Sequence, residues 1–540
     1  MQDSTAAQVS PRHDSQAKTA APAGHPGGEG PARAGLGGAW WACAIGALAL
    51  ISLGLGVFEL VRAAGPYDIL EYDDGVWFGA AVRLADGALP YRDFVLDQPP
   101  GVPLLLSPVA LLSHAFGTGE ALVAARYVTV LVEAANVVLV GWLVRHRSVL
   151  CVVVAGAVVA VYPAAVITSR TVMLEPYCDL WCLIGLVAAF DKGHVTTTSR
   201  RALMAGAAFG VAGTCKAFAL LPFVVLVVQM ALRGPAGRRQ AGRCVAAAAG
   251  VFAFICAPFV LMAPAGFFRQ VVLTQLERGA IANPSLWGRV AQLVGVPPAP
   301  SMFGVPSAVL DDVVFAVSAV VCLALVVAWW AARRPAGSSL ERYGVVVVVL
   351  TAAGLTWPAA FYYHYAAFLA PFLALPLGLA AGRLYGANRR ALVRGAASAL
   401  VVVGTVHAVR VVQTTDPPGL VDIAWLDRAV PSGACAITDD PAVLVLADRF
   451  SAPPGCSDMV DADGSTLSWS GGRRGYQSLS QPRAITDWLG VLGQTGYVVV
   501  TQGMVPARIP WGPALLDYLH AHFHLSAEQA GVVVWARRSS

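Results

Sequence analysis

The feature that most constrains this chain is a series of long apolar runs. Runs of about 18 or more apolar residues are long enough to cross a lipid bilayer as helices. Clear cases are Trp40 to Leu60, Val149 to Ile167 and Val313 to Trp330. The chain is 57% hydrophobic with a mean hydropathy of +0.63, which is too apolar for a soluble domain of this length. We therefore expect a polytopic α-helical membrane protein.

Basic residues between the apolar segments predict the orientation. They cluster near residues 145–147, 192–201, 233–243, 333–342 and 383–394. Cytosolic loops are enriched in Lys and Arg, so we place all five clusters in the cytosol, with two spans between successive clusters. The resulting eleven spans lie at 40–61, 120–144, 149–168, 176–190, 202–215, 218–232, 244–262, 310–331, 343–360, 362–382 and 394–412. The N-terminus is then cytosolic and the C-terminus lies outside the plasma membrane. The net charge of +5 gives no sign of nucleic-acid binding, because topology accounts for the basic residues.

Composition divides the chain into three parts. Residues 1–36 are rich in Ala, Gly, Pro and Ser, which predicts a disordered cytosolic tail. Residues 37–412 form the transmembrane domain. Within it, Gly101 to Gly117 is apolar but short and interrupted by prolines, so we expect a helix at the outer face rather than a span.

Residues 413–540 lack long apolar runs and predict a separate extracytoplasmic α/β domain. Short apolar strands at 434–438, 497–501 and 531–535 alternate with helical patterns at 421–430, 441–449, 483–495 and 511–523. The stretch 464–481 is rich in Ser, Gly and Arg, which predicts a flexible loop.

Cysteine positions agree with this division. Eight of the ten cysteines lie in or beside apolar spans, where a free Cys is usually a small apolar side chain. Cys435 and Cys456 are the two in the external domain. In an oxidising compartment they would close a loop of about 20 residues, which favours a disulfide.

Polar residues gather in four clusters that the eleven-span topology places on the outer face. They are Asp73-Asp74 with Trp77, Arg170 with Glu175, Lys216, and the run Tyr362-Tyr363-His364-Tyr365. Each has an ordinary structural explanation as well. The acidic pair can cap a helix, Lys216 can snorkel to water, and the tyrosines can form an interfacial aromatic belt.

Taken together, separated carboxylates and cations on one face favour catalysis on a lipid-linked phosphorylated sugar. A sugar carried on a lipid phosphate leaves as a phosphate monoester, which needs little protonation. The acceptor hydroxyl needs a base, and a carboxylate on the opposite face of the sugar supplies one in an inverting displacement. Cations would hold the phosphate.

These motifs resemble those of the GT-C superfamily of membrane glycosyltransferases, in particular the protein O-mannosyltransferase and aminoarabinose-transferase group and its actinobacterial relatives. Asp73-Asp74-Gly75-Val76-Trp77 is similar to the acidic motif of the first external loop. The resemblance continues through Pro90-Tyr91-Arg92-Asp93-Phe94, Gln98-Pro99-Pro100-Gly101, Arg170 to Pro176, Thr214 to Ala217 and Tyr362 to Pro371. It covers residues 40 to 412. The chain departs from the pattern at Gln98, where many relatives carry Lys, at Ala217, where they carry Gly, and at Glu175, where Asp is common.

The resemblance implies roles for individual residues. Asp73 would be the catalytic base, with Asp74 as runner-up, and Glu175 would orient the acceptor or a divalent cation. Lys216, Arg170, Gln98, Tyr363 and His364 would bind substrate or the donor phosphate. No metal ligands are assigned.

The predicted function is inverting transfer of a hexose or pentose from a polyprenyl-phosphate donor to an external glycan, lipid or protein acceptor. The Ala-, Val- and Gly-rich, Lys-poor composition is typical of a GC-rich bacterium, in which decaprenyl-phosphate mannose or arabinose would serve a cell-wall enzyme. A transporter or flippase of a lipid-linked saccharide is the alternative. A transporter would predict charges buried within spans and inverted repeats. The sequence has few charges within spans, of which Glu133 is the main one, and no inverted repeat is evident, so we prefer the transferase.

Overall fold

The structure is a computed structural model that describes residues 32–62, 65–279, 284–295, 330, 338–386, 390–415, 422–450, 453–501 and 503–538. It divides into a short N-terminal unit, 1–40, and a large unit, 41–540. Everything below concerns the large unit, apart from the first residues of helix α1. Residues 1–31 of the expected disordered tail, and the span expected at 310–331 apart from residue 330, lie outside the described residues, while residues 32–36 of that tail belong to helix α1.

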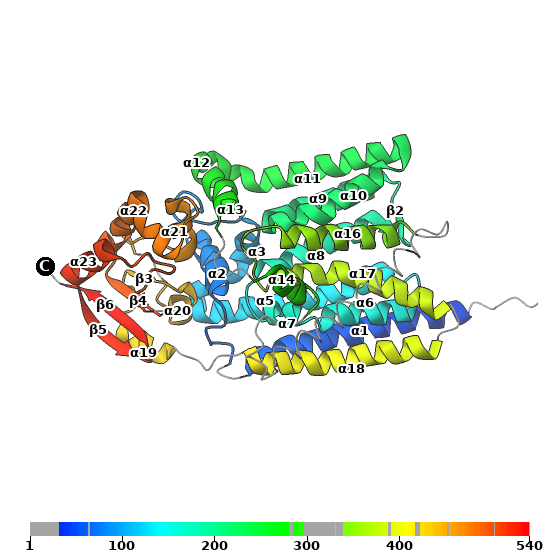
Figure 1. Cartoon of the computed structure of the whole chain (residues 1–540), viewed down its shortest axis with the longest axis horizontal. Helices are drawn as coiled ribbons and strands as arrows, with labels where there is room; N and C mark the ends of the chain where they lie inside the picture. The colour runs from blue at the N-terminus through cyan, green and yellow to red at the C-terminus, as the bar shows by residue number, and fades with distance from the viewer. Residues whose placement is uncertain are drawn as a thin grey trace, which may run out of the picture. The chain divides into compact units, whose positions relative to one another are not determined.

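The region up to Thr415 is mostly helical (Figure 1). Its longer helices are α1 (Ala32–Val61), α5 (Thr118–Val144), α8 (Leu174–Ala189), α9 (Ser199–Cys215), α11 (Gly234–Met262), α16 (Ser339–Thr356), α17 (Tyr365–Gly386) and α18 (Arg390–Thr415). Its shorter elements are α2 (Tyr72–Ala85), α3 (Gly101–Ala110), α4 (Ser113–Phe116), α6 (Val149–Ala160), α7 (Pro163–Ser169), β1 (Phe190–Asp191), β2 (His194–Val195), η1 (Ala217–Ala219), α10 (Leu220–Ala231), α12 (Pro264–Phe267), η2 (Phe268–Leu273), α13 (Thr274–Glu277) and α14 (Leu286–Leu293).

The described helices make this a multi-pass membrane protein. Five of them are long and apolar enough to cross a membrane, or six if the bent pair α6 and α7 is one span. The other expected spans on described residues coincide with helices that are shorter or more polar, so the count of eleven stays a prediction. The bend between α6 and α7 is 59° and falls at Tyr162-Pro163. Proline has no N–H to donate and disfavours helical backbone before it, which explains the break.

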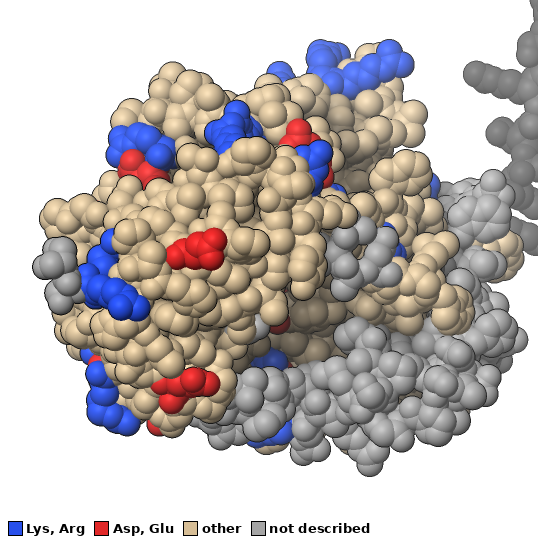
Figure 2. Space-filling model, turned by 60° about the vertical axis from the view of Figure 1, so that its left-hand side comes forward, with Lys and Arg blue, Asp and Glu red and all other residues tan. Residues whose placement is uncertain are grey.

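The charged side chains of the molecule are sparse. On the face shown in Figure 2, basic and acidic side chains form scattered patches on a surface made mainly of other residues. This distribution agrees with the content of 13% charged residues. It makes the concentration of charge in the cavity described below a distinctive feature of the chain.

The C-terminal region contains a four-stranded mixed sheet with the order β3-β4-β6-β5. Strand β3 pairs in parallel with β4, and the other two pairings are antiparallel. The elements are α19 (Ile423–Ala429), β3 (Ala436–Thr438), α20 (Pro441–Leu446), α21 (Ala462–Ser470), η4 (Gly475–Ser480), α22 (Pro482–Gly493), β4 (Tyr497–Val500), α23 (Pro513–His522), β5 (Phe523–Gln529) and β6 (Val532–Arg537).

Two sequence expectations in this region were wrong. The stretch 464–481 is not a flexible loop, because α21 and η4 occupy most of it. Asp461 starts α21 by accepting a hydrogen bond from the Gly464 N–H at 2.8 Å, and this N-cap outweighs the weak helix propensity of Ser and Gly. The second difference is β5, which the sequence pattern did not indicate. Its residues are largely exposed apart from Phe523, so it lacks the apolar alternation of a half-buried strand.

The C-terminal region packs directly on the outer helices through α2 and α20. A Cβ atom at Gly75 would lie 2.1 Å from the Ala442 backbone nitrogen, so only glycine allows this approach. Val443 and Leu444 of α20 belong to the same buried apolar cluster as Val76 and Phe78 of α2. This contact brings residues near 461–508 over the start of α2.

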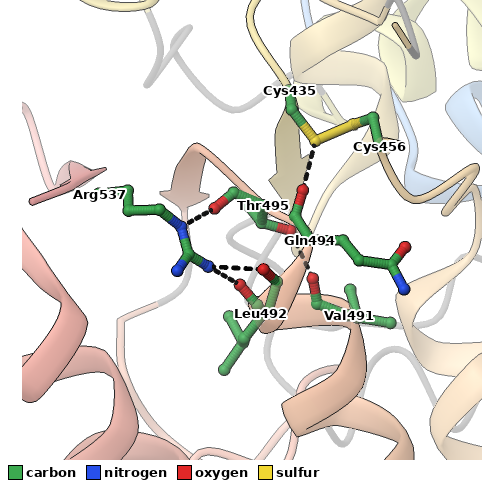
Figure 3. The surroundings of a disulfide bond; sticks show 8 residues. Cys435, Cys456, Val491, Leu492, Gln494, Thr495 and Arg537 are labelled. Carbon is green, nitrogen blue, oxygen red and sulfur yellow. Dashed lines mark hydrogen bonds between the residues drawn. A yellow bond between two sulfur atoms is a disulfide. The ribbon is translucent and has the colours of Figure 1, made fainter. Parts of the chain in front are cut away.

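A disulfide joins Cys435 to Cys456, with Cα atoms 5.5 Å apart (Figure 3). It ties the start of β3 to the segment before α21. We expect Cys435→Ser to lower the free energy of unfolding of the full chain by about 3 kcal/mol, because the unfolded chain regains the freedom of a closed loop. Thermal unfolding of purified protein measures this effect. Labelling with a thiol reagent should detect a newly reactive Cys456, and unchanged stability together with that label would contradict the prediction.

Candidate active site

A cavity of about 420 Å³ lies where the outer helices meet the C-terminal region. Polar and aromatic residues from both parts line it. The helical part contributes Glu71, Tyr72, Asp73, Trp77, Asp97, Gln98, Lys216, Arg278 and Tyr362 to Tyr365, and the C-terminal region contributes Asp461, Asp463, Arg474 and Arg508. The cavity therefore brings together positions that are far apart in the sequence.

The two adjacent acids of the first motif have different surroundings. Both lie in the first turn of α2, where successive side chains point in different directions. The Asp73 side chain faces the cavity and is 32% exposed, whereas Asp74 is fully buried. Asp74 accepts a hydrogen bond from Arg126 Nε at 2.8 Å and one from the Val172 N–H at 2.7 Å. The carboxylate of Asp74 is thus occupied by a buried ion pair, and Asp73 is the one open to a ligand.

His364 links the two predicted acidic sites. Its Nδ1 lies 2.7 Å from Glu175 Oε1, and its Nε2 lies 4.0 Å from Asp73 Oδ2. The Lys216 ammonium donates to the same Glu175 oxygen. Four residues that the sequence analysis singled out are therefore connected, in the order Asp73, His364, Glu175, Lys216.

Lys216 does not snorkel. Its side chain is only 7% exposed and lies at the C-terminal end of α9, with the ammonium 4.7 Å from the ring centre of Phe218 and 4.6 Å from that of Tyr365. A snorkelling lysine would place its ammonium in water. The ammonium instead lies in the wall of the cavity, held by Glu175 and two aromatic faces.

The remaining predicted residues are divided between the cavity and its surroundings. Gln98 and Tyr363 line the cavity, and the Tyr363 hydroxyl donates to Glu71 Oε2 at 3.0 Å. Arg170 does not line it. Its Nη1 lies 3.2 Å from Glu59 Oε1 of helix α1, and both side chains are buried. The structure therefore places Arg170 in an ion pair beside the site.

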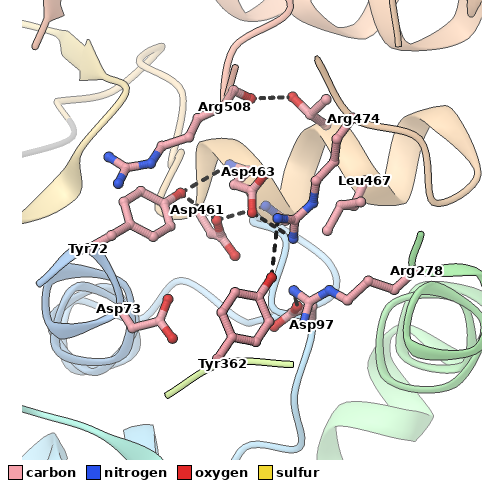
Figure 4. A network of polar contacts seen from close by, with 12 residues as sticks. Tyr72, Asp73, Asp97, Arg278, Tyr362, Asp461, Asp463, Leu467, Arg474 and Arg508 are labelled. Atoms are coloured by element: carbon pink, nitrogen blue, oxygen red, sulfur yellow. Dashed lines mark hydrogen bonds and ion pairs between the residues drawn. The ribbon is translucent and has the colours of Figure 1, made fainter. Parts of the chain in front are cut away.

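The roof of the cavity is a polar network that the sequence analysis missed (Figure 4). The Tyr72 hydroxyl donates to Asp461 Oδ1 at 2.6 Å and accepts from the Asp463 N–H at 3.0 Å. Arg474 forms an ion pair with Asp463 at 2.7 Å. The Arg508 guanidinium lies 3.8 Å from the centre of the Tyr72 ring. No local motif marks these C-terminal residues, so only the fold shows that they face α2.

Arg278 and Asp97 complete the cavity wall. Arg278 Nη2 lies 2.8 Å from Asp97 Oδ2. Burial is the largest single influence and lowers the pKa of Arg278, but Asp97, Tyr362, Tyr365 and Asp463 together raise it by more, so the guanidinium stays charged. Together with Lys216, Arg474 and Arg508 it places four cations in the described lining of the cavity, which also holds five carboxylates. Cations of this kind form the strong contacts to phosphate groups in proteins.

Burial dominates the electrostatics of the acids in the cavity. It raises the pKa of Asp73, and it raises that of Asp461 to about 7. Among the described residues that line the cavity, Trp77 also carries a buried indole N–H with no hydrogen-bond partner. Buried donors are rarely unpaired, so this N–H is an exception among the described residues of the cavity.

The raised pKa of Asp73 predicts how activity depends on pH. A base acts only when deprotonated, so activity should be kept above that pKa and lost as the pH falls through it. His364 and, more weakly, Lys216 and Arg278 lower the pKa of Asp73, whereas Asp97 raises it. We expect His364→Gln to move the acidic limb of the profile of kcat/KM against pH to higher pH. An acidic limb that stays in place would contradict an interaction between these two groups.

The described residues offer no group of three His, Cys, Asp or Glu side chains arranged to hold a metal ion. The predicted acids Asp73 and Glu175 are instead bridged by His364. The described acids thus do not fit the cation site that the sequence analysis left open, and we derive no step through a metal.

Comparisons with solved structures show which known fold this chain has. ArnT from Cupriavidus metallidurans, solved with bound undecaprenyl phosphate, matches with a TM-score of 0.61 over 93% of this chain and 98% of that one, at 13% identity. The apo state of the same protein matches with a TM-score of 0.58. The chain has the fold of GT-C membrane glycosyltransferases. The fold that the sequence motifs predicted is thereby confirmed.

A second GT-C enzyme shares the architecture. The oligosaccharyltransferase of Archaeoglobus fulgidus, solved with a tethered acceptor peptide, matches with a TM-score of 0.54 over 93% of this chain and 74% of that one, at 12% identity. No protein-family model matches the sequence, and no curated protein matches it. The likeness therefore lies in the fold, while sequence identity is low throughout.

Proposed function

We propose that this GT-C-fold protein is an inverting glycosyltransferase that moves a sugar from a polyprenyl-phosphate donor to an acceptor outside the plasma membrane. The observation that carries the proposal is the position of Asp73. It is a carboxylate open to a cavity whose wall also holds Lys216 and Arg278. One cavity therefore offers both a base for an acceptor hydroxyl and cations for a departing phosphate.

Asp73 is suited to be the base. Its raised pKa makes it a stronger proton acceptor than an ordinary aspartate, while it stays deprotonated when the pH exceeds that pKa. In the proposed reaction the acceptor oxygen attacks the anomeric carbon and the bond from that carbon to the phosphate oxygen breaks. The acceptor proton passes to an Asp73 carboxylate oxygen, and the polyprenyl phosphate leaves. Attack opposite the leaving group inverts the anomeric centre.

The cations of the cavity serve the leaving group. As the glycosidic bond breaks, negative charge grows on the phosphate, and a preorganised cation in a site with little water stabilises that charge. Lys216 has three N–H donors, and Glu175 needs only one of them. Arg278 is fixed by Asp97 and presents a planar set of donors beside it.

The topology of the proposal follows the positive-inside rule. If all basic clusters are cytosolic, an even number of spans must separate each cluster from the next, as in the eleven-span arrangement. That arrangement would place the cavity at the outer face. The C-terminal α/β region would then be extracytoplasmic, which agrees with its disulfide. The lipid tail of the donor would lie along the apolar helices.

Donor consumption tests the proposed function. Membranes from expressing cells are incubated with radiolabelled polyprenyl-phosphate mannose, arabinose and glucose, with empty-vector membranes as control. Transfer of label to a water-soluble or lipid product with an inverted linkage supports the proposal. Movement of intact donor across sealed vesicles without consumption would favour the transporter alternative. Neither activity with any donor would overturn the enzymatic assignment.

Lys216 allows a sharper test of phosphate binding. We expect Lys216→Gln to raise the KM for donor by about tenfold or more, because a charge-assisted contact to phosphate is lost. Lys192→Gln, at an exposed turn between β1 and β2, is the matched control. The double variant Lys216→Gln with Glu175→Gln removes the unpaired buried acid and separates binding from stability. Equal, small effects at both lysines would contradict the role of Lys216.

A further inference from the structure

A second and larger cavity, of about 580 Å³, lies beside the candidate active site. The loop 91–98, the segment 270–278 and the segment 457–475 each line both cavities. Within these elements the Leu96 N–H donates a hydrogen bond of 2.9 Å to Gln270 Oε1. The two cavities are therefore neighbours that share one set of structural elements.

The lining of the second cavity suits a ligand rich in hydroxyl groups. It offers the carboxylates of Asp93, Asp458 and Asp487 together with the Gln494 amide and the Thr486 hydroxyl. Hydroxyls both donate and accept, so they need such a mixture of partners. Trp469 adds an aromatic side chain to the same wall, and aromatic rings cover the apolar face of a ligand that is polar at its edges.

Among the described residues, the second cavity has no excess of positive charge, because three carboxylates and two arginines line it. Arg92 forms an ion pair with Asp93 at 2.7 Å, and Arg483 forms one with Asp487 at 3.5 Å. A phosphate or an anionic polymer would be repelled by the carboxylates that outnumber the arginines here. This lining favours a neutral ligand over a second donor molecule.

A peptide is a poorer fit. Extended peptides commonly bind by adding a strand to an exposed sheet edge. None of the residues that line this cavity belongs to a strand of the described four-stranded sheet. The cavity is built by helices and loops, which give a peptide backbone no row of pairing groups.

The cavity is also rigid. The Trp469 ring lies edge-on to the buried Trp488 ring, with centroids 5.6 Å apart. Cys456 in the lining is held by the disulfide, and the Cys435 sulfur lies 3.0 Å from the Gln494 backbone oxygen (Figure 3). A wall fixed before binding loses less entropy when a ligand binds.

We propose that this second cavity binds a neutral saccharide chain, the part of the acceptor that does not react. This inference rests on the proposed function, because it assigns the acceptor of that reaction to a glycan. The reacting hydroxyl would lie at Asp73, and preceding sugar units would lie against Trp469. Binding energy from units remote from the reaction can be used to position the hydroxyl.

Two substitutions test the cavity without touching the catalytic residues. Gly490→Trp fills it from helix α22, at an exposed position where an added Cβ meets nothing within 4 Å. Gly242→Trp is the matched control, because it is also an exposed helical glycine with open space around it. Trp469→Ala removes the aromatic wall, and Trp469→Phe restores it.

Binding is measured by calorimetry on full-length protein in lipid nanodiscs, with neutral tetrasaccharides of mannose, glucose, galactose and arabinose as probes. We expect at least one tetrasaccharide to bind more tightly than its monosaccharide. Gly490→Trp and Trp469→Ala should weaken that binding by about tenfold or more, as expected on loss of an anchoring aromatic contact. Gly242→Trp and Trp469→Phe should leave it nearly unchanged.

Other outcomes overturn the inference. They are no binding of any tetrasaccharide, equal binding in Gly490→Trp and Gly242→Trp, or a Gly490-dependent affinity for an unrelated peptide instead. Asp73→Asn keeps this test separate from that of the proposed function, because it should leave saccharide affinity unchanged while transfer is lost. Saccharide binding that depends on Gly490, without transfer from any donor, would refute the proposed glycosyltransferase activity and support saccharide binding in the second cavity. Sugar transfer without such binding would support the glycosyltransferase activity and refute saccharide binding in the second cavity.

Discussion

Replacing Asp73 by Asn reduces sugar transfer by about 10²–10⁴-fold, the range expected when a general base is lost. The amide has nearly the same shape as the carboxylate but cannot take the acceptor proton. Because Asp73 is 32% exposed in the cavity and its nearest charged contact is His364 at 4.0 Å, the fold should not depend on its charge. Initial rates of transfer at saturating donor, with protein abundance in the membrane as control, measure the effect. Near-normal activity would remove Asp73 from the mechanism.

Replacing the neighbouring Asp74 by Ala should lower the stability of the protein rather than the activity of each folded molecule. It leaves Arg126 charged and fully buried without its partner, which typically costs about 3–5 kcal/mol. We expect a lower unfolding temperature and lower abundance, with loss of activity only in proportion to the loss of folded protein.

A double variant separates a structural from a catalytic role for Asp74. Asp74→Leu with Arg126→Met removes both buried charges and should recover much of the lost stability, because replacing a buried ion pair by apolar groups is often nearly neutral. Full stability with absent transfer in this variant would assign chemistry to Asp74 and contradict the contrast between the two acids.

The sequence predicted several of the residues of the helical part that gather at the cavity, because their positions follow from the order of the helices. Asp73, Lys216 and His364 each stand at the end of a helix or in a loop beside one, so the apolar segments and the basic clusters between them predicted that they share one face. The sequence could not tell Asp73 from Asp74, because that distinction depends on Arg126, which no motif links to the pair. Nor could it place Arg170, whose partner Glu59 lies on another helix.

The polar network of C-terminal residues over the cavity could not be predicted from the sequence, for a different reason. Tyr72 and Asp461 are separated by 389 positions in the chain, and their contact depends on how the C-terminal region packs on α2. Composition was also misleading there, since the Ser- and Gly-rich stretch after Asp461 forms helix α21 once that aspartate caps it. Capping is a single hydrogen bond, and it can decide the structure of a stretch with weak intrinsic preference.

The shared construction of the cavity has a consequence for biosynthesis. A ribosome that has reached Thr415 has made Asp73, Lys216 and His364, yet none of the C-terminal residues that line the same cavity. Until α20 packs on Gly75 and brings Asp461, Asp463 and Arg508 over α2, the Asp73 carboxylate lacks this side of the cavity. Under the proposed function, the nascent chain would insert among donor lipids before its site is complete. Competence to react would then begin only after the last strand, β6, joins its sheet.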